Sequence, residues 1–118
     1  MTQVNIKRVY DEPSEQDGYR VLVDRLWPRG MKREYLKYDY WAKEVTPYND
    51  LRKWFHADIE KRWGAFADMY QKELKESDPA NAFIDKIKAY SKVTLLYASK
   101  EQERNHANVL KHYLDTHL

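Results

Sequence analysis

The sequence predicts a small single α/β domain over residues 1–118, in which several helices pack against a sheet of about three strands that is at least partly parallel. Two observations predict this fold. Three short segments have the apolar, β-branched character of strands. Most of the chain between the second and third of them carries apolar side chains at helical spacing instead. Few strands and many helices in one short chain favour a small sheet covered by helices.

The strands are predicted from their apolar patterns. Residues 4–9 are β-branched and alternating, and residues 93–98 are continuously apolar. Residues 19–24 place apolar side chains on both faces, which is typical of an interior parallel strand. Turn-forming residues predict a loop over 11–18, and Trp27-Pro28-Arg29-Gly30 predicts a turn after the second strand.

The segment 32–45 fits two structures. Tyr38 and Tyr40 alternate as in a strand, whereas Leu36, Tyr40 and Trp41 have helical spacing. We expect a short helix there.

Three helices follow, and each begins at a predicted capping residue. Thr46 with Pro47 predicts an N-cap followed by proline at the first helical position, Asp58 is the expected cap of the second helix, and Asp78-Pro79 repeats the first signal. The apolar spacing predicts these buried residues: Leu51, Trp54 and Phe55; then Ile59, Trp63, Phe66, Ala67, Tyr70 and Leu74; then Phe83, Ile84, Ile87 and Tyr90.

The last strand leads into a final helix. The segment from Ser99 to Gln102 fits a capping box, and the helix after it is expected to bury its apolar face. The residues of that face are Ala107, Leu110, Tyr113 and Leu114.

Composition excludes several classes of protein. A chain of 118 residues can bury about two-thirds of its surface, so it needs no crosslink or metal to fold. It has no cysteine, which excludes disulfides, thiolate catalysis, iron–sulfur clusters and cysteine zinc sites. Mean hydropathy is −0.95, and no apolar run approaches the roughly 20 residues of a membrane helix. With no signal peptide visible at the start, we expect a soluble cytoplasmic protein without membrane contact.

The first candidate site follows the second strand, where Asp24, Arg25, Trp27, Arg29 and Gly30 lie together in sequence. Open α/β sheets bind ligands beyond the carboxyl ends of their strands. Two arginines offer forked donors to an anion, the glycine lets backbone approach closely, and an indole between cations can stack on a planar ligand. The alternative is a Pro-Gly turn that an Asp–Arg pair holds for structural reasons alone.

The second candidate is Asn105-His106, in the first two turns of the last helix. If the second and third strands are parallel neighbours, His106 shares an edge with the basic turn, and Asp24 could orient its imidazole for general acid–base catalysis. The alternative is a half-buried histidine without function. The other histidines, His56, His112 and His117, lack the spacing of a ligand set, so we predict no metal site and no cofactor.

Several segments together resemble one known family. They are Ile6-Lys7-Arg8-Val9-Tyr10, the run from Asp17 to Gly30 with its Val-Asp-Arg-Leu-Trp-Pro-Arg-Gly core, the run from Leu51 to His56, Leu95-Leu96-Tyr97-Ala98, and Asn105-His106-Ala107. In this order they are similar to the YeaO-like branch of the domain-of-unknown-function family 488 (DUF488), small bacterial proteins, over residues 5 to 114.

The family has no established reaction, so the resemblance implies a group of residues rather than a mechanism. The broader family often carries cysteines around the last strand and the next helix, including a Cys-His-Arg segment. This chain has Tyr97 and Asn105-His106-Ala107 there, so a mechanism that needs those cysteines cannot operate. The resemblance implies that Arg8, Trp54 and the two candidate sites act together. Parallel strands would gather them, with Tyr97, on one edge.

These observations predict an enzyme, or a small-molecule binding protein descended from one, whose Arg- and Trp-lined pocket takes an anionic, for example nucleotide-like, ligand. Asp24 and His106 would handle a proton if there is chemistry, while Arg8, Arg25, Trp27, Arg29, Gly30, Trp54, Tyr97 and Asn105 would bind the ligand. One alternative is a nucleic-acid-binding module that uses the basic segment 25–37 with nearby tyrosines. Another is a protein-interaction domain with exposed aromatic side chains.

Overall fold

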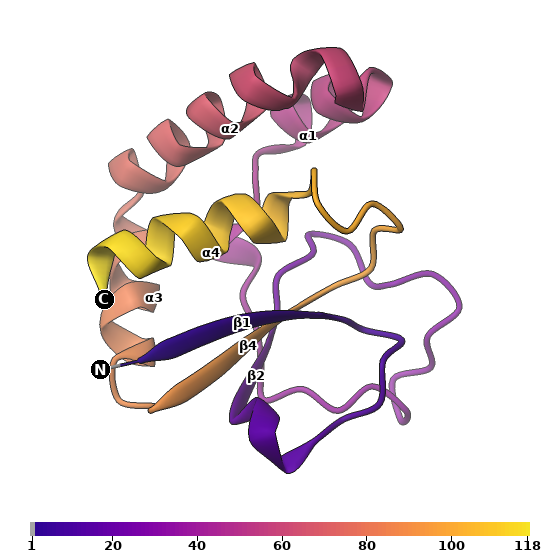
Figure 1. The fold of residues 1–118 in the computed structure, drawn as a ribbon, viewed down its shortest axis with the longest axis vertical. Helices are drawn as coiled ribbons and strands as arrows, with labels where there is room; N and C mark the ends of the chain where they lie inside the picture. Colours follow the sequence, from indigo (N-terminus) through magenta and orange to yellow (C-terminus); the bar gives the residue numbers. More distant parts are fainter. Residues whose placement is uncertain (1) are drawn as a thin grey trace.

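Four strands form one parallel sheet in the order β1-β4-β2-β3 in the computed structural model, which describes residues 2–118 (Figure 1). The strands are β1 (Gln3–Arg8), β2 (Tyr19–Leu22), β3 (Tyr40–Trp41) and β4 (Lys92–Tyr97). In the register of the sheet, Arg8 pairs with Tyr97 and Leu22 with Leu96. The predicted α/β class and parallel strands are confirmed, and β3 adds an unpredicted fourth strand.

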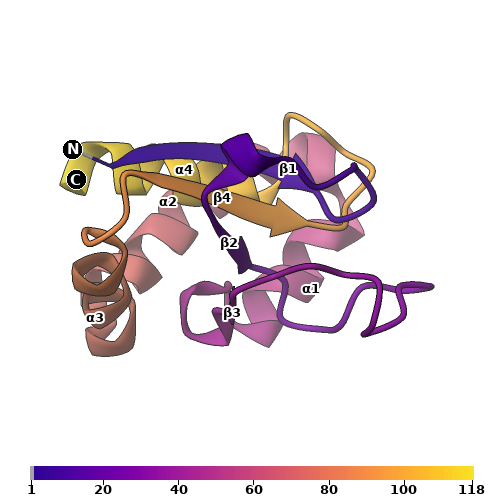
Figure 2. The same ribbon diagram turned by 90° about the horizontal axis from the view of Figure 1, so that it is seen from below.

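Helices cover one side of this sheet. They are α1 (Asn49–Ala57), α2 (Ile59–Glu76), α3 (Asp78–Ile87) and α4 (His106–His117), with short 3-10 turns at Glu15–Asp17 and Lys43–Val45. The helix α4 packs directly on β1 and β4, and α2 packs on α4 and α1. Figure 2 shows α1, α2 and α4 on the same side of the sheet.

Both faces of the two inner strands are buried. Val21 and Leu95 point into the main core, where they join aromatic side chains of α1 and α2. Leu22 and Leu96 point the other way, into a smaller cluster closed by the segment between β2 and β3. All four of these side chains are fully buried, as the continuous apolar character of their strands predicts.

The segment 32–45 is not the expected helix. It runs as a loop into β3 and then into the 3-10 turn. Tyr40 and Trp41 pair with Val21 and Leu22, and the Trp41 indole donates a hydrogen bond to the Asp24 carbonyl at 2.7 Å. Contacts with a distant part of the chain therefore override the local helical spacing of the segment.

Two of the predicted helix starts are displaced. The helix α1 begins at Asn49 without a side-chain cap, because the Thr46 hydroxyl donates to the Lys43 carbonyl instead. Ser77, rather than Asp78, caps α3 by accepting a hydrogen bond from the backbone of Ala80.

Other predicted ends can be compared directly with the structure. Asp58 caps α2 as predicted, with a hydrogen bond from the Lys61 backbone at 3.3 Å. Tyr90, predicted to be buried on α3, lies beyond the end of that helix and is exposed.

The last helix starts later than its predicted capping box. The Ser99 hydroxyl accepts a hydrogen bond from the Glu101 backbone within a loop, and α4 begins only at His106. Asn105 is the N-cap, because its side-chain oxygen accepts from the Asn108 backbone at 2.9 Å. The loop 98–105 consequently lies at the carboxyl edge of the sheet.

None of the helices in residues 2–118 combines the length and the apolar character that crossing a membrane would require.

Candidate functional site

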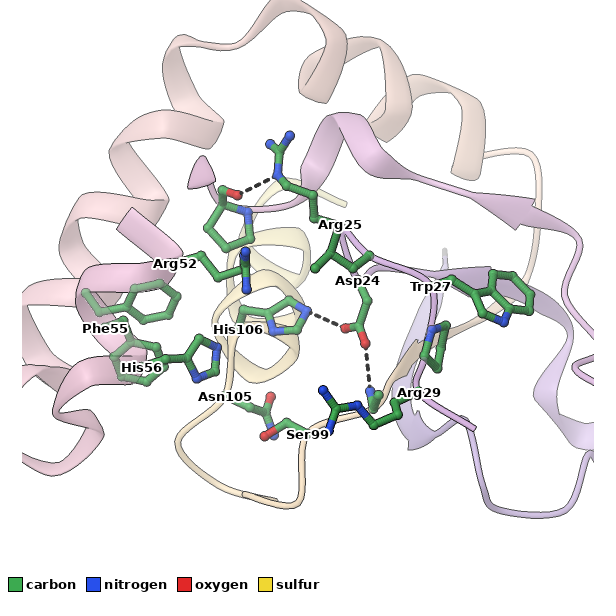
Figure 3. Close-up of a pocket in the computed structure, with 15 residues that line it drawn as sticks. Asp24, Arg25, Trp27, Arg29, Arg52, Phe55, His56, Ser99, Asn105 and His106 are labelled. Carbon is green, nitrogen blue, oxygen red and sulfur yellow. Dashed lines mark hydrogen bonds and ion pairs between the residues drawn. The ribbon is translucent and has the colours of Figure 1, made fainter. Parts of the chain in front are cut away.

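A cavity of about 230 Å³ opens where β2 and β4 end, at the carboxyl edge of the sheet (Figure 3). Its wall comes from the segment after β2, from α1 and α2, and from the loop that leads into α4. The residues are Asp24, Arg25, Leu26, Trp27, Pro28 and Arg29; Pro47, Arg52, Phe55 and His56; Phe66; and Ala98, Ser99, Asn105 and His106. Parallel α/β sheets commonly bind ligands at this edge.

The structure brings Asp24 and His106 together. One carboxylate oxygen of Asp24 lies 3.0 Å from His106 Nε2, and the other accepts a hydrogen bond from the Ala98 backbone, also at 3.0 Å. Both side chains are 15% exposed. A single carboxylate thus connects the segment after β2 to the end of β4 and to the start of α4.

His106 Nε2 also lies 2.9 Å from the Val23 carbonyl oxygen, within hydrogen-bond distance. A carbonyl oxygen only accepts hydrogen bonds, so Nε2 carries a proton and donates it. The nitrogen beside Asp24 is therefore a donor in this arrangement, and a base at His106 would have to act through Nδ1.

Arg25 and Arg29 line the cavity with different partners. Arg25 Nε donates to the Pro47 carbonyl at 3.2 Å, and its guanidinium points away from His106 in Figure 3. Arg29 extends toward the cavity from the other side. Arg25 therefore ties the segment after β2 to the chain before α1, whereas Arg29 is the more exposed of the two cations.

Two basic residues of the cavity wall were not among the predicted site residues. Arg52 and His56 lie one turn apart on α1, on either side of Phe55. The Arg52 Nη2 atom donates to Asn49 at 3.1 Å, but its Nε atom is buried and has no hydrogen-bond partner among the described residues. The sequence does contain a signal for these two residues, because they are four positions apart on one helix and flank a buried aromatic side chain. This spacing does not indicate which edge of the sheet α1 faces.

The electrostatics of the cavity are positive. Its wall holds three arginines and two histidines against one carboxylate. Burial, followed by the nearby His106 and Arg52, lowers the pKa of His56 below its usual 6.5, although Asp24 acts in the opposite direction. The lowered pKa favours the neutral form of His56, and the arginines supply the fixed charge.

Arg8 and Tyr97 line a separate hollow of about 360 Å³ beside the loop 98–105. The Arg8 guanidinium donates to the Ala98 and Ser99 carbonyls, each at 3.0 Å. These bonds hold the loop from the side opposite to Asp24, so Arg8 supports the cavity wall without lining it.

Trp54 and Gly30 also lie outside the cavity wall. The Arg62 guanidinium covers the Trp54 ring at 4.7 Å and donates to the Trp54 carbonyl. Gly30 has a φ of 76° in the turn after β2, a conformation that favours glycine. Asn105, in contrast, lines the cavity and caps α4.

The basic and aromatic segment 25–37 is largely engaged in its own packing. Trp27 donates to the Met31 carbonyl at 2.6 Å and contacts Trp41 edge to face. The Arg33 guanidinium lies 4.8 Å over the Trp27 ring, and Lys32 lies over Tyr35. These contacts give the segment a structural role, and nucleic-acid binding by it stays a prediction.

Within residues 2–118, no three potential ligand side chains gather as a metal ion would need.

Fold and site together define a class: a single α/β domain with a parallel sheet and a cation-lined cavity at its carboxyl edge. A family model described as the inactive DUF488-N3 subclade matches residues 3–118, and the chain belongs to this DUF488 family. The resemblance noted from the sequence motifs is thereby confirmed.

Two relatives are similar over nearly the whole chain. "Uncharacterized protein YeaO" of Escherichia coli K12 is 42% identical over 111 residues, covering 94% of this chain and 96% of the relative. "Uncharacterized protein Rv3073c" of Mycobacterium tuberculosis H37Rv is 40% identical over 114 residues, covering 97% and 95%. No solved structure gives a significant match.

Proposed function

We propose that this chain is a small-molecule binding protein, which takes an anionic ligand into the cavity at the carboxyl edge and does not transform it. The observation that carries the proposal is the charge of the cavity wall, which includes three arginines, Arg25, Arg29 and Arg52, and one carboxylate, Asp24. Arginine forks match carboxylate and phosphate groups, and in a partly buried site such charge-assisted bonds are strong.

Two features support binding rather than catalysis. Asp24 and His106, the pair best suited to move a proton, are both committed to contacts that hold the fold. The subclade to which the chain belongs is described as inactive, and the chain has no cysteine that could act as a nucleophile.

A thermal-shift screen tests this proposal. Carboxylates, phosphates and nucleotides are added at millimolar concentration to the wild type and to Arg29→Gln, which removes an exposed cation of the cavity wall. We expect at least one anion to raise the melting temperature of the wild type, because a ligand that binds only the folded state stabilises it. The same anion should raise that of the variant less.

Lys61→Gln is the matched control, since Lys61 is an exposed cation outside the cavity wall. Its response to the anion should equal that of the wild type. If no anion of the panel stabilises the wild type, the proposal is wrong.

A further inference from the structure

We infer that the ligand of this cavity is a small, mainly apolar carboxylate, such as an aryl or branched-alkyl carboxylate, bound through Arg52, and is neither a nucleotide nor a phosphorylated compound. The inference rests on the proposed function, because it names the class of anion that the cavity takes. Three properties of the wall carry it: its volume, its apolar surface and the hydrogen bonds already made by the backbone amides of the neighbouring loop.

The volume sets the size of the ligand. A cavity of about 150 Å³ can hold benzene, and pockets for drug-sized ligands begin at about 300 Å³. The cavity here, at about 230 Å³, lies between these limits. It suits a ligand on the order of ten non-hydrogen atoms, and a mononucleotide is roughly twice that size.

Much of the cavity wall between the cations is apolar. This apolar part consists of two phenylalanines, two prolines, a tryptophan and a leucine: Phe55, Phe66, Pro28, Pro47, Trp27 and Leu26. Phe55 and Phe66 stack at 3.9 Å between ring centroids and are almost fully buried, so this part of the wall is rigid. An apolar group of the ligand would gain from leaving water here, whereas a ribose would have few partners for its hydroxyl groups.

Several backbone amides at this edge, of the kind that a phosphate uses, already have acceptors. Phosphates commonly bind the free amides at a helix N-terminus or in the loop before it. Here the Ala98 amide donates to Asp24 and the Glu101 amide donates to the Ser99 hydroxyl. The first turn of α4 is capped by Asn105. These three amides already have acceptors from the chain itself, which favours binding of an anion through the side chains of the cavity wall.

Arg52 is a residue of the cavity wall that has a buried donor without a partner. Its Nε atom is buried and has no hydrogen-bond partner within residues 2–118, and its Nη2 atom donates to Asn49 at 3.1 Å. A buried donor without an acceptor is unfavourable, and a carboxylate would supply the missing partner. Figure 3 shows Arg52 beside His106 and above His56, where the ligand's charged end would meet several cationic or polar groups.

The test is a titration of the full chain labelled with ¹⁵N, followed by two-dimensional NMR at pH 7. The probes are benzoate, its neutral analogue benzamide, inorganic phosphate and adenosine monophosphate. We expect benzoate to give saturable shifts confined to the cavity wall and to bind at least about tenfold more tightly than each of the other three.

The variants are Arg52→Gln and, as the matched control, Lys53→Gln, which removes one exposed cation from the same helix without touching the cavity wall. Benzoate should bind about tenfold more weakly to Arg52→Gln and unchanged to Lys53→Gln. The same spectra report whether each variant is folded. If Arg52→Gln is unfolded, the four probes on the wild type decide the question alone.

The outcomes separate the two proposals. Tighter binding of phosphate or adenosine monophosphate than of benzoate would overturn the ligand class and leave the anion-binding function standing. Benzamide binding as tightly as benzoate, or folded Arg52→Gln binding benzoate as the wild type does, would overturn the role of Arg52. If none of the anions gives saturable shifts, both proposals fail.

Discussion

Asp24 connects three segments of the chain through its own atoms. Its carboxylate accepts a hydrogen bond from the Ala98 backbone and lies against His106, while its carbonyl accepts from the Trp41 indole. These partners belong to the loop after β4, to α4 and to β3. At this position one residue joins both neighbours of β2 and the last helix.

Replacing Asp24 by alanine should lower the free energy of unfolding by about 2–3 kcal/mol, because the partly buried Ala98 amide loses its acceptor and His106 loses its partner. Asp24→Asn should lose less, since an amide oxygen can still accept from Ala98. Urea denaturation measures both changes. An alanine variant as stable as the wild type would show that the fold does not depend on this carboxylate.

The residues of the site differ in how far the sequence predicts them. The contact of Asp24 with His106 was anticipated because each follows a strand, and the carboxyl ends of parallel strands meet at one edge. Arg52 and His56 were missed because α1 reaches this edge only through the packing of Phe55 against Phe66, which depends on the three-dimensional fold. The chemical roles of all these side chains remain predictions.

Among the elements, α4 begins later than its sequence pattern predicts, because its N-cap is Asn105 and not Ser99. Ser99 carries the expected pattern, but the loop after β4 continues to Asn105 before the helix begins. Asn105 is 2% exposed, caps the Asn108 backbone and donates to the Glu101 carbonyl at 2.7 Å. It therefore fixes both the start of α4 and the shape of the loop before it.

Asn105→Ala should lower the free energy of unfolding by about 1–2 kcal/mol, since the first turn of α4 loses its cap. Asn105→Ser should recover part of that loss, because a serine hydroxyl can accept from the Asn108 backbone in the same way. Thermal or urea unfolding of the two variants beside the wild type checks this order. Equal stability of the alanine and serine variants would contradict the capping role.

The strands show why some elements can be predicted from the sequence and others cannot. β2 and β4 are buried on both faces, so their continuous apolar runs are strong local signals. β3 has only two residues, and its strand conformation comes from pairing with Val21 and Leu22. No pattern within the segment 32–45 contains that information, which explains why a helix was expected there.

In the whole molecule, the amino-terminal half is held together by a buried ion cluster. Asp17 pairs with both Lys7 of β1 and Arg20 of β2. Arg20 also donates through Nε to the Lys37 carbonyl and through its backbone to Asp39. The cluster therefore connects two strands to the segment that leads into β3.

This cluster should make stability depend on pH at the acid side. Burial alone would raise the pKa of Asp17, but hydrogen bonds from Ser14 and Lys7, the charge of Lys7 and the hydrogen bond from Arg20 outweigh it and lower the pKa below 3.8. The folded state therefore binds this proton less readily than the unfolded state. The stabilisation from Asp17 is present above about pH 4 and is lost as the pH falls through its lowered pKa.

Asp17→Asn should lower the free energy of unfolding at pH 7 by about 3 kcal/mol, because two cations lose their buried partner. The difference between variant and wild type should shrink as the pH falls below about 4. Urea denaturation at pH 7, 5 and 3 measures it, with Asp85→Asn as the control, since Asp85 forms an exposed pair with Lys88. A difference that stays constant down to pH 3 would contradict the pKa direction.

The order of the strands has a consequence for how the protein is made. β4 lies between β1 and β2 in the sheet, although it is the last strand along the chain. While a ribosome synthesises the polypeptide from its amino end, β1 has no partner strand until Lys92–Tyr97 has left the exit tunnel. The sheet can close only after β4 has emerged, so the earlier strands and helices must wait for their central strand during synthesis.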